Sequence, residues 1–272
     1  MKKIAIISLL ISGYIVAFSQ SEGHFGGGAS FVSLAGMTTV VPGVESLYHN
    51  HTQLLRLQNG WGIDASAEQR FGLSELNTIS LGSFIKREND CFALSISRFG
   101  FQAYFEQEIS ISYARKMLDK FYFGAKINHT SYHTDKFGST SILTTDFGLT
   151  ANISSTVWMG GFIRNPFNFK VTSYNALPAV IAAGVQYLAG KKISILLETE
   201  KIIDRNVVFR LGLTYDMAEQ LEIRLGTDLT RSIFGLGFGF RFHRNAKMRG
   251  AFSMHNVLGI TPALSIQYQQ LK

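Results

Sequence analysis

The strongest constraint on the fold is a strict alternation of residue types across residues 219–242. Two runs in this segment, 221–229 and 233–242, place an apolar residue at nearly every second position. The residues between are small or charged, and in IFGLGFGFRF they include Gly235, Gly237 and Gly239. Because successive side chains on a strand point to opposite faces, each run has one apolar face. The segment therefore predicts a β-hairpin with Leu236, Phe238 and the other apolar residues on one side.

The second face of this hairpin indicates the environment. A strand face in bulk water rarely consists of glycine, whereas a transmembrane barrel presents apolar residues to lipid and small or charged residues to its lumen. After the N-terminus, the chain has no run of about 20 apolar residues, which a transmembrane helix requires. With 17% charged residues, the composition also fits a barrel. A soluble all-β protein rich in aromatic residues is the alternative.

The same alternation recurs from Gly60 to the C-terminus, interrupted by turn residues. It predicts an all-β fold: a transmembrane antiparallel β-barrel of about 14 strands, an even number as such barrels usually have. The longer connections, 134–140 and 164–176, would be extracellular if the chain enters from the periplasm. The last strand should close against the first. The expected strands cover residues 61–71, 76–86, 92–99, 101–115, 121–133, 141–153, 157–163, 177–188, 193–202, 207–215, 221–229, 233–242, 248–255 and 263–269.

The N-terminal 58 residues differ from the rest. Lys2 and Lys3 precede the apolar run 4–18, and Ala17-Phe18-Ser19 has the small-x-small form of a cleavage site, so residues 1–19 are predicted to be a signal peptide. Export of a barrel implies the outer membrane of a Gram-negative bacterium. Residues 20–58 contain many apolar groups without clean alternation, and we expect a short N-terminal plug there. The barrel domain is expected over residues 59–272.

Motifs that carry chemistry are lacking in the sequence. It contains no Gly-x-Ser-x-Gly, HExxH, phosphate-binding loop or Cys/His metal spacing, and it predicts no enzyme, catalytic residue, cofactor or metal site. His49 and His51 could form a metal pair, but we interpret them as ordinary solvated residues. The formal charge of +7 is spread along the chain without a basic run, which argues against a nucleic-acid partner.

Seven charged residues are candidates for the lumen face of the barrel. Pairing across neighbouring strands would offset their desolvation. Arg210, Arg224 and Arg241 could also meet Glu45 or backbone carbonyls of the plug. A catalytic or binding site based on paired carboxylates is the alternative interpretation. The seven candidates are Glu106, Glu108, Arg210, Glu222, Arg224, Asp228 and Arg241.

A family resemblance accompanies these patterns. The stretch from Gly27 to Ala35, followed by Leu47-Tyr48-His49-Asn50, resembles the plug of PorV/PorQ-like proteins, and the loop Asn165-Pro166-Phe167-Asn168 looks similar as well. That family usually has Asn-Pro-Ala where this chain has Asn50-His51-Thr52. PorV/PorQ-like proteins belong with the long-chain fatty-acid transporter class of fourteen-stranded outer-membrane barrels. The resemblance implies that fold and brings no catalytic residues.

The resemblance implies two functions. The first is a non-enzymatic outer-membrane barrel accessory to protein secretion or cell-surface assembly, as in type IX secretion. Its partners would be outer-membrane lipid and secretion-machinery or exported proteins. Short outer loops favour this role. The alternative is an outer-membrane conduit for hydrophobic small molecules such as fatty acids. A lipid-modifying enzyme ranks third, because no Ser/His constellation occurs on one predicted rim.

Overall fold

The structure is a computed structural model, which describes residues 26–136, 138–167, 169–172 and 175–271. The predicted signal peptide lies outside the described residues. Within the described part of the chain, none of the helices is both long enough and apolar enough to span a membrane.

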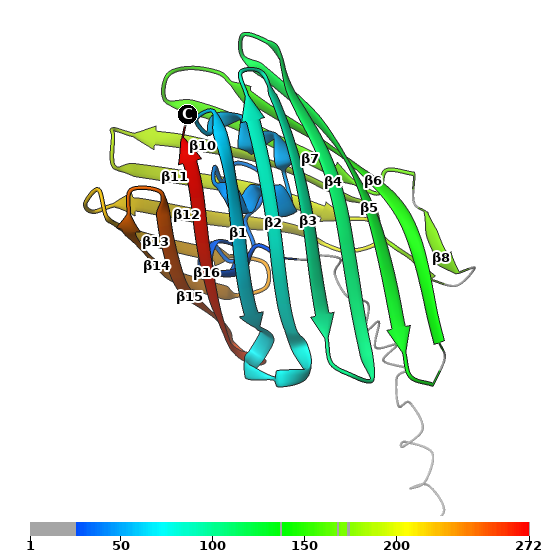
Figure 1. The fold of residues 1–272 in the computed structure, drawn as a ribbon. Helices are drawn as coiled ribbons and strands as arrows, with labels where there is room; N and C mark the ends of the chain where they lie inside the picture. Colours follow the sequence, from blue (N-terminus) through cyan, green and yellow to red (C-terminus); the bar gives the residue numbers. More distant parts are fainter. Residues whose placement is uncertain (1–25, 137, 168, 173–174, 272) are drawn as a thin grey trace, which may run out of the picture.

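Fourteen strands form a closed antiparallel barrel (Figure 1). Strands adjacent in sequence are adjacent in the sheet, and the last strand pairs with the first from Gly60↔Leu271 to Glu68↔Ala263. The predicted barrel architecture is therefore confirmed. Its strands are β1 (Gly60–Gln69), β2 (Asn77–Arg87), β3 (Asp90–Gly100), β4 (Tyr104–Leu118), β5 (Phe121–Thr134), β6 (Gly138–Asn152), β7 (Val157–Arg164), β10 (Val180–Ala189), β11 (Ile193–Ile202), β12 (Val207–Asp216), β13 (Leu221–Asp228), β14 (Ile233–His243), β15 (Ala246–His255) and β16 (Gly259–Leu271).

The connections distinguish the two ends of the barrel. We call the end where β1 begins and β16 ends the terminal edge, and the opposite end the distal edge. At the distal edge, β1 and β2 are joined through the 3₁₀ turns η3 (Arg70–Gly72) and η4 (Ser74–Leu76). The long connection after β7 is at the same edge and forms a small sheet of β8 (Lys170–Thr172) and β9 (Asn175–Ala176), which the alternation did not predict. The expected strand over 177–188 begins only at Val180, after Pro178.

The two faces of the wall follow the alternation. On β14, Phe234, Phe238 and Phe240 are 46–51% exposed on the outside, whereas Gly235 and Gly237 are buried on the inside. Other strands likewise carry exposed Leu, Ile and Phe side chains outward, and serine, threonine and charged residues inward. An apolar exterior of this kind is what lipid requires.

Residues 26–58, which we call the lumen segment, lie inside the barrel (Figure 1). The segment contains one short α-helix, α1 (Gly28–Ser33), and two 3₁₀ helices, η1 (Val44–Tyr48) and η2 (His51–Arg56). The helix α1 packs against β1 and β13–β16, and η2 packs against the opposite wall at β4–β6. Nearly all residues from 26 to 55 are buried. This segment occupies the lumen, and its contacts define the candidate site.

Candidate functional site

Glu45 is the centre of an ionic cluster between the lumen segment and the wall. It follows the Pro42-Gly43 turn at the start of η1 and is 4% exposed. Its carboxylate accepts hydrogen bonds from Ser30 Oγ and from Gln267 Nε2, each at 2.6 Å. Arg224 on β13 and Arg249 on β15 lie 3.3 and 3.2 Å away. Burial alone would raise the pKa of Glu45, but Arg249 and Arg224 outweigh it and lower the pKa to about 2.

Glu222 completes this cluster from the wall. It accepts ion pairs from Arg224 Nε at 2.8 Å, Arg249 Nε at 2.9 Å and Lys247 Nζ at 2.6 Å. Two carboxylates and three cations from β13, β15 and η1 thus compensate one another in a buried setting, as desolvated charges require.

A second cluster holds the lumen segment through its backbone. Arg210 on β12 pairs with Glu198 at 2.9 Å, Glu200 at 3.1 Å and Asp228 at 3.4 Å. Glu198 in turn accepts hydrogen bonds from the backbone N–H groups of Thr38 and Thr39 at 2.8 and 2.7 Å. Thr38 and Thr39 lie outside any helix or strand, so the carboxylate satisfies backbone donors that secondary structure does not.

Uncharged groups and Lys126 hold the segment to the other wall. Gln53 Nε2 donates to the Thr39 carbonyl at 2.7 Å and to Thr150 Oγ1 on β6 at 2.8 Å. Lys126 Nζ on β5 donates to the Tyr48 carbonyl at 2.8 Å and pairs with Asp146 at 3.3 Å. The lumen segment is therefore bonded to strands around the whole barrel.

The candidates from the sequence lie in four places. Arg224 and Glu222 belong to the Glu45 cluster, and Arg210 and Asp228 to the Glu198 cluster. Glu106 and Glu108 are buried on β4, where they accept hydrogen bonds from Tyr104 and Ser110. Arg241 is exposed at the terminal edge.

The expected contacts of the arginines with Glu45 differ in detail. Arg224 makes the contact, but Arg210 pairs with strand carboxylates, and the second arginine at Glu45 is Arg249. Arg249 lies in the strand that the alternation predicted. Its role depends on the register of β15 against β16, where it stands opposite Ser265, and that register is not visible in the sequence.

The expectation that His49 and His51 are solvated is wrong: both are buried in the lumen segment, against different neighbours. The His49 ring stacks on Phe31 with centroids 5.4 Å apart, whereas His51 packs against Gly124 on β5. Burial, with Lys126 nearby, lowers the pKa of His51 to about 4. No group of three or more His, Cys, Asp or Glu residues capable of holding a metal occurs in the described ranges.

Two cavities adjoin the lumen segment at opposite ends. The vestibule is a cavity of about 480 Å³ at the terminal edge, between Val41–Val44 and Arg56–Gln58 of the segment and the ends of β11–β16. The distal cavity, of about 130 Å³, lies between α1 and the distal ends of β1 and β12–β16. Its apolar lining includes Phe31, Val32 and Ile233. The Glu45 and Glu198 clusters separate them.

Comparisons with known proteins place the fold. No protein-family model matches the chain, and no curated protein does. The chain is similar to the Ralstonia pickettii toluene transporter TbuX, at 10% identity and a TM-score of 0.71 over 92% of this chain and 100% of that one. It is also similar to the CymD monoaromatic hydrocarbon channel, at 12% identity and a TM-score of 0.66 over 92% of this chain and 99% of that one. A Pseudomonas aeruginosa FadL homologue matches at 10% identity and a TM-score of 0.62 over 89% of this chain and 98% of that one.

These similarities show the fold of the fatty-acid transporter class, in which the resemblance had placed the chain; they do not single out PorV/PorQ-like proteins. With the closed barrel and its apolar exterior, they confirm the predicted location in the outer membrane of a Gram-negative bacterium. The neighbours are transport channels rather than enzymes.

Proposed function

We propose that the protein is a passive conduit for small hydrophobic molecules across the outer membrane. In this proposal residues 1–19 are a signal peptide, 20–58 a plug and 59–272 the barrel. The observation that carries it is the distal cavity, which lies at the distal end of the lumen segment, opposite the vestibule. Phe31, Phe71 and Ile233 give it an apolar side, beside charged residues such as Glu68 and Arg70. Molecules would collect in the distal cavity and leave through the vestibule when the plug shifts.

The size of the distal cavity favours a small molecule. Its volume of about 130 Å³ is close to that of an engineered apolar cavity of about 150 Å³ that binds benzene. Phe31, Phe71 and Ile233 would contact such a ring. TbuX is a toluene transporter and CymD a monoaromatic hydrocarbon channel, and such molecules are of this size. A single aromatic ring therefore fits this pocket better than a long acyl chain.

An accessory role in protein secretion is the alternative that the motifs implied. It is supported by the resemblance of 27–35 and 47–50 to PorV/PorQ-like plugs. The fold neighbours support the conduit instead, and we rank the conduit first.

The first prediction fills the distal cavity. Ile233 points inward at the start of β14, so Ile233→Trp should occupy much of the pocket and reduce toluene entry severalfold. Ile195, which is 41% exposed on the outer face of β11, supplies the matched control Ile195→Trp. The measurement is uptake of labelled toluene by cells of a Gram-negative host that produce equal amounts of folded barrel.

Equal uptake by the two variants, or no difference between the wild type and cells without the barrel, would contradict the conduit. An export assay in the native host covers the alternative. If deletion of residues 26–55 abolishes export of surface proteins and leaves toluene uptake unchanged, the accessory role is the correct one.

A further inference from the structure

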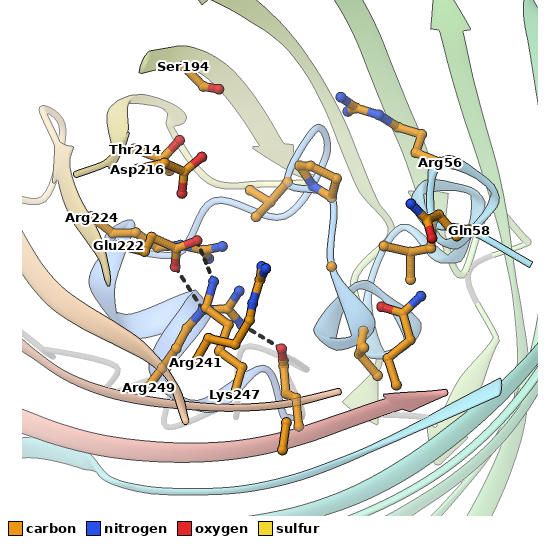
Figure 2. Close-up of a pocket in the computed structure, with 18 of the residues that line it drawn as sticks. Arg56, Gln58, Ser194, Thr214, Asp216, Glu222, Arg224, Arg241, Lys247 and Arg249 are labelled. Atoms are coloured by element: carbon orange, nitrogen blue, oxygen red, sulfur yellow. Dashed lines mark hydrogen bonds and ion pairs between the residues drawn. The ribbon is translucent and has the colours of Figure 1, made fainter. Parts of the chain in front are cut away.

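The vestibule carries far more positive than negative charge. Its lining includes six cationic side chains but only two carboxylates, Asp216 and Glu222. Figure 2 shows most of the cations gathered with Glu222 on one side of the cavity and Arg56 on the other. The cations are Arg56, Arg224, Arg241, Arg244, Lys247 and Arg249.

The internal carboxylates do not neutralise this set. Arg224 and Arg249 share Glu45 and Glu222, and Lys247 also uses Glu222. Arg241 and Arg244 make no side-chain hydrogen bond or ion pair with any described residue. The vestibule thus retains two arginines whose five-donor guanidinium groups are available.

Arg241 also faces a like charge on the neighbouring strand. Its cross-strand partner on β15 is Lys247, and like charges directly opposite each other destabilise a sheet. Alternation along β14 directs Arg241 toward the lumen, with Phe238 and Phe240 on the lipid side. Arg244 lies in the turn between β14 and β15. A bound anion would relieve the repulsion between Arg241 and Lys247 and engage Arg244.

Arg56 faces this group from the lumen segment. Its guanidinium lies over the Trp158 ring at 4.1 Å and donates to Gln53 and Gln186, both uncharged. Burial lowers the pKa of Arg56 to about 10, which leaves it charged at neutral pH. Apolar surface adjoins it: Val41, Val44, Leu57 and Leu196 also line the cavity.

We propose that the vestibule is a binding site for an organic anion, with a carboxylate or phosphate-monoester head at Arg241 and Arg244 and a compact apolar body against Val41, Val44 and Leu57. Arginine forks bind both head groups with paired hydrogen bonds. The volume of about 480 Å³ is within the range of small-molecule pockets. This site goes beyond the proposed passage of neutral hydrocarbons and does not depend on it.

The test is equilibrium binding to the purified full-length mature barrel in a non-ionic detergent, by calorimetry. Benzoate and phenyl phosphate are the anionic probes, and benzyl alcohol is the neutral one. We expect saturable binding of at least one anion, weaker at higher salt because the cavity opens to solvent. Benzyl alcohol should bind at least tenfold more weakly. The stronger anion identifies the head group.

The double variant Arg241→Gln/Arg244→Gln should weaken anion binding at least tenfold, since each arginine contributes charge-assisted hydrogen bonds. Arg87→Gln is the matched control: Arg87 lies at the same edge but on the outer face beside Ile85 and Phe92, and its loss should leave binding unchanged. Heat-modifiable migration verifies that each variant is folded, and Arg244→Gln alone, in the turn, replaces the double variant if needed.

Three results would overturn the proposal: no saturable binding of either anion to the wild type, wild-type affinity in the folded arginine variant, or benzyl alcohol binding as tightly as benzoate. Toluene uptake does not enter any of these measurements, so failure here leaves the conduit proposal untouched.

Discussion

At the scale of single residues, Glu45 connects the lumen segment to the wall. It is held by two arginines, a serine and a glutamine from four different elements or connections. Removing one partner from a buried ionic group costs about 3–5 kcal/mol, because the remaining charges lose compensation. Glu222 still pairs with Arg224 and Arg249 when Glu45 is changed, so the wall keeps most of its charge compensation. A change at Glu45 should therefore weaken mainly the attachment of the lumen segment.

Glu45→Gln should therefore loosen residues 26–58 without opening the barrel. We expect faster cleavage of this segment by an added protease, with heat-modifiable migration unchanged. Glu88→Gln, which removes the same charge at the exposed turn between β2 and β3, would separate loss of this cluster from a general effect of altered charge. Cleavage of Glu45→Gln at the wild-type rate would show that the cluster does not hold the segment.

The same residue predicts a dependence on pH. The folded pKa of Glu45, about 2, is below its ordinary value of 4.5, so its stabilisation is complete above pH 4.5 and is lost as pH falls toward 2. The pKa of His51 is lowered from 6.5 to about 4. As pH falls through that range, the folded state loses further stability, because the imidazole binds a proton in the unfolded segment before it does so in the folded one. In Glu45→Gln, the stability of the bound lumen segment should depend less on pH below pH 4. The dependence between pH 6.5 and 4, which comes from His51, should remain. Protease sensitivity against pH measures both.

At the scale of elements, glycine is required on the inner face of β14 because the lumen segment packs against it. A Cβ at Gly235 would lie 2.5 Å from the Val32 carbonyl oxygen and 2.6 Å from that of Ser33, and a Cβ at Gly226 on β13 would lie 2.3 Å from the Leu34 backbone. The glycine face therefore lets the backbone of residues 32–34 lie directly on the wall. The sequence predicted that this face is small and inward, but not that α1 packs on it.

Gly235→Ala should displace α1 and destabilise the folded protein by about 1–3 kcal/mol, since the nearest atoms are backbone and cannot move aside. Gly250→Ala on β15 is the matched control, because a Cβ there meets nothing within 4 Å. Both changes reduce the entropy of the unfolded chain alike, so their difference isolates the contact with α1. Urea unfolding in detergent measures it, and similar midpoints for the two variants would refute the packing argument.

The sequence determined more of the elements than of the site. All fourteen barrel strands were predicted, because lipid outside and a polar lumen inside impose period two on each of them. The contacts of Glu198 with Thr38 and Thr39 could not be predicted, since they join positions about 160 residues apart through the register of the whole sheet. Both cavities arise in the same way, from where the lumen segment lies.

At the scale of the whole molecule, closure of β16 on β1 is the condition for stability in lipid. An open edge would leave backbone N–H and C=O groups unsatisfied where no water can reach them. The long connection after β7 has no such role: Asn165 Nδ2 donates to the Leu177 carbonyl at 2.7 Å, so the connection is already closed at its base. Deletion of β16 should therefore prevent folding, whereas shortening of the connection after β7 should be tolerated.

Deletion of residues 259–272 removes β16 and leaves β1 and β15 as edges. We expect no heat-modifiable species in the outer membrane, because each exposed edge costs several kcal/mol for every unsatisfied group. The control replaces residues 169–176 by a Gly-Ser link, which should fold and insert normally, since residues 165 and 177 already meet. Membrane fractions compared by electrophoresis with and without heating distinguish the two. Normal accumulation of the truncated chain would mean that another segment closes the barrel, and the register of β16 against β1 would then not be what holds the wall together.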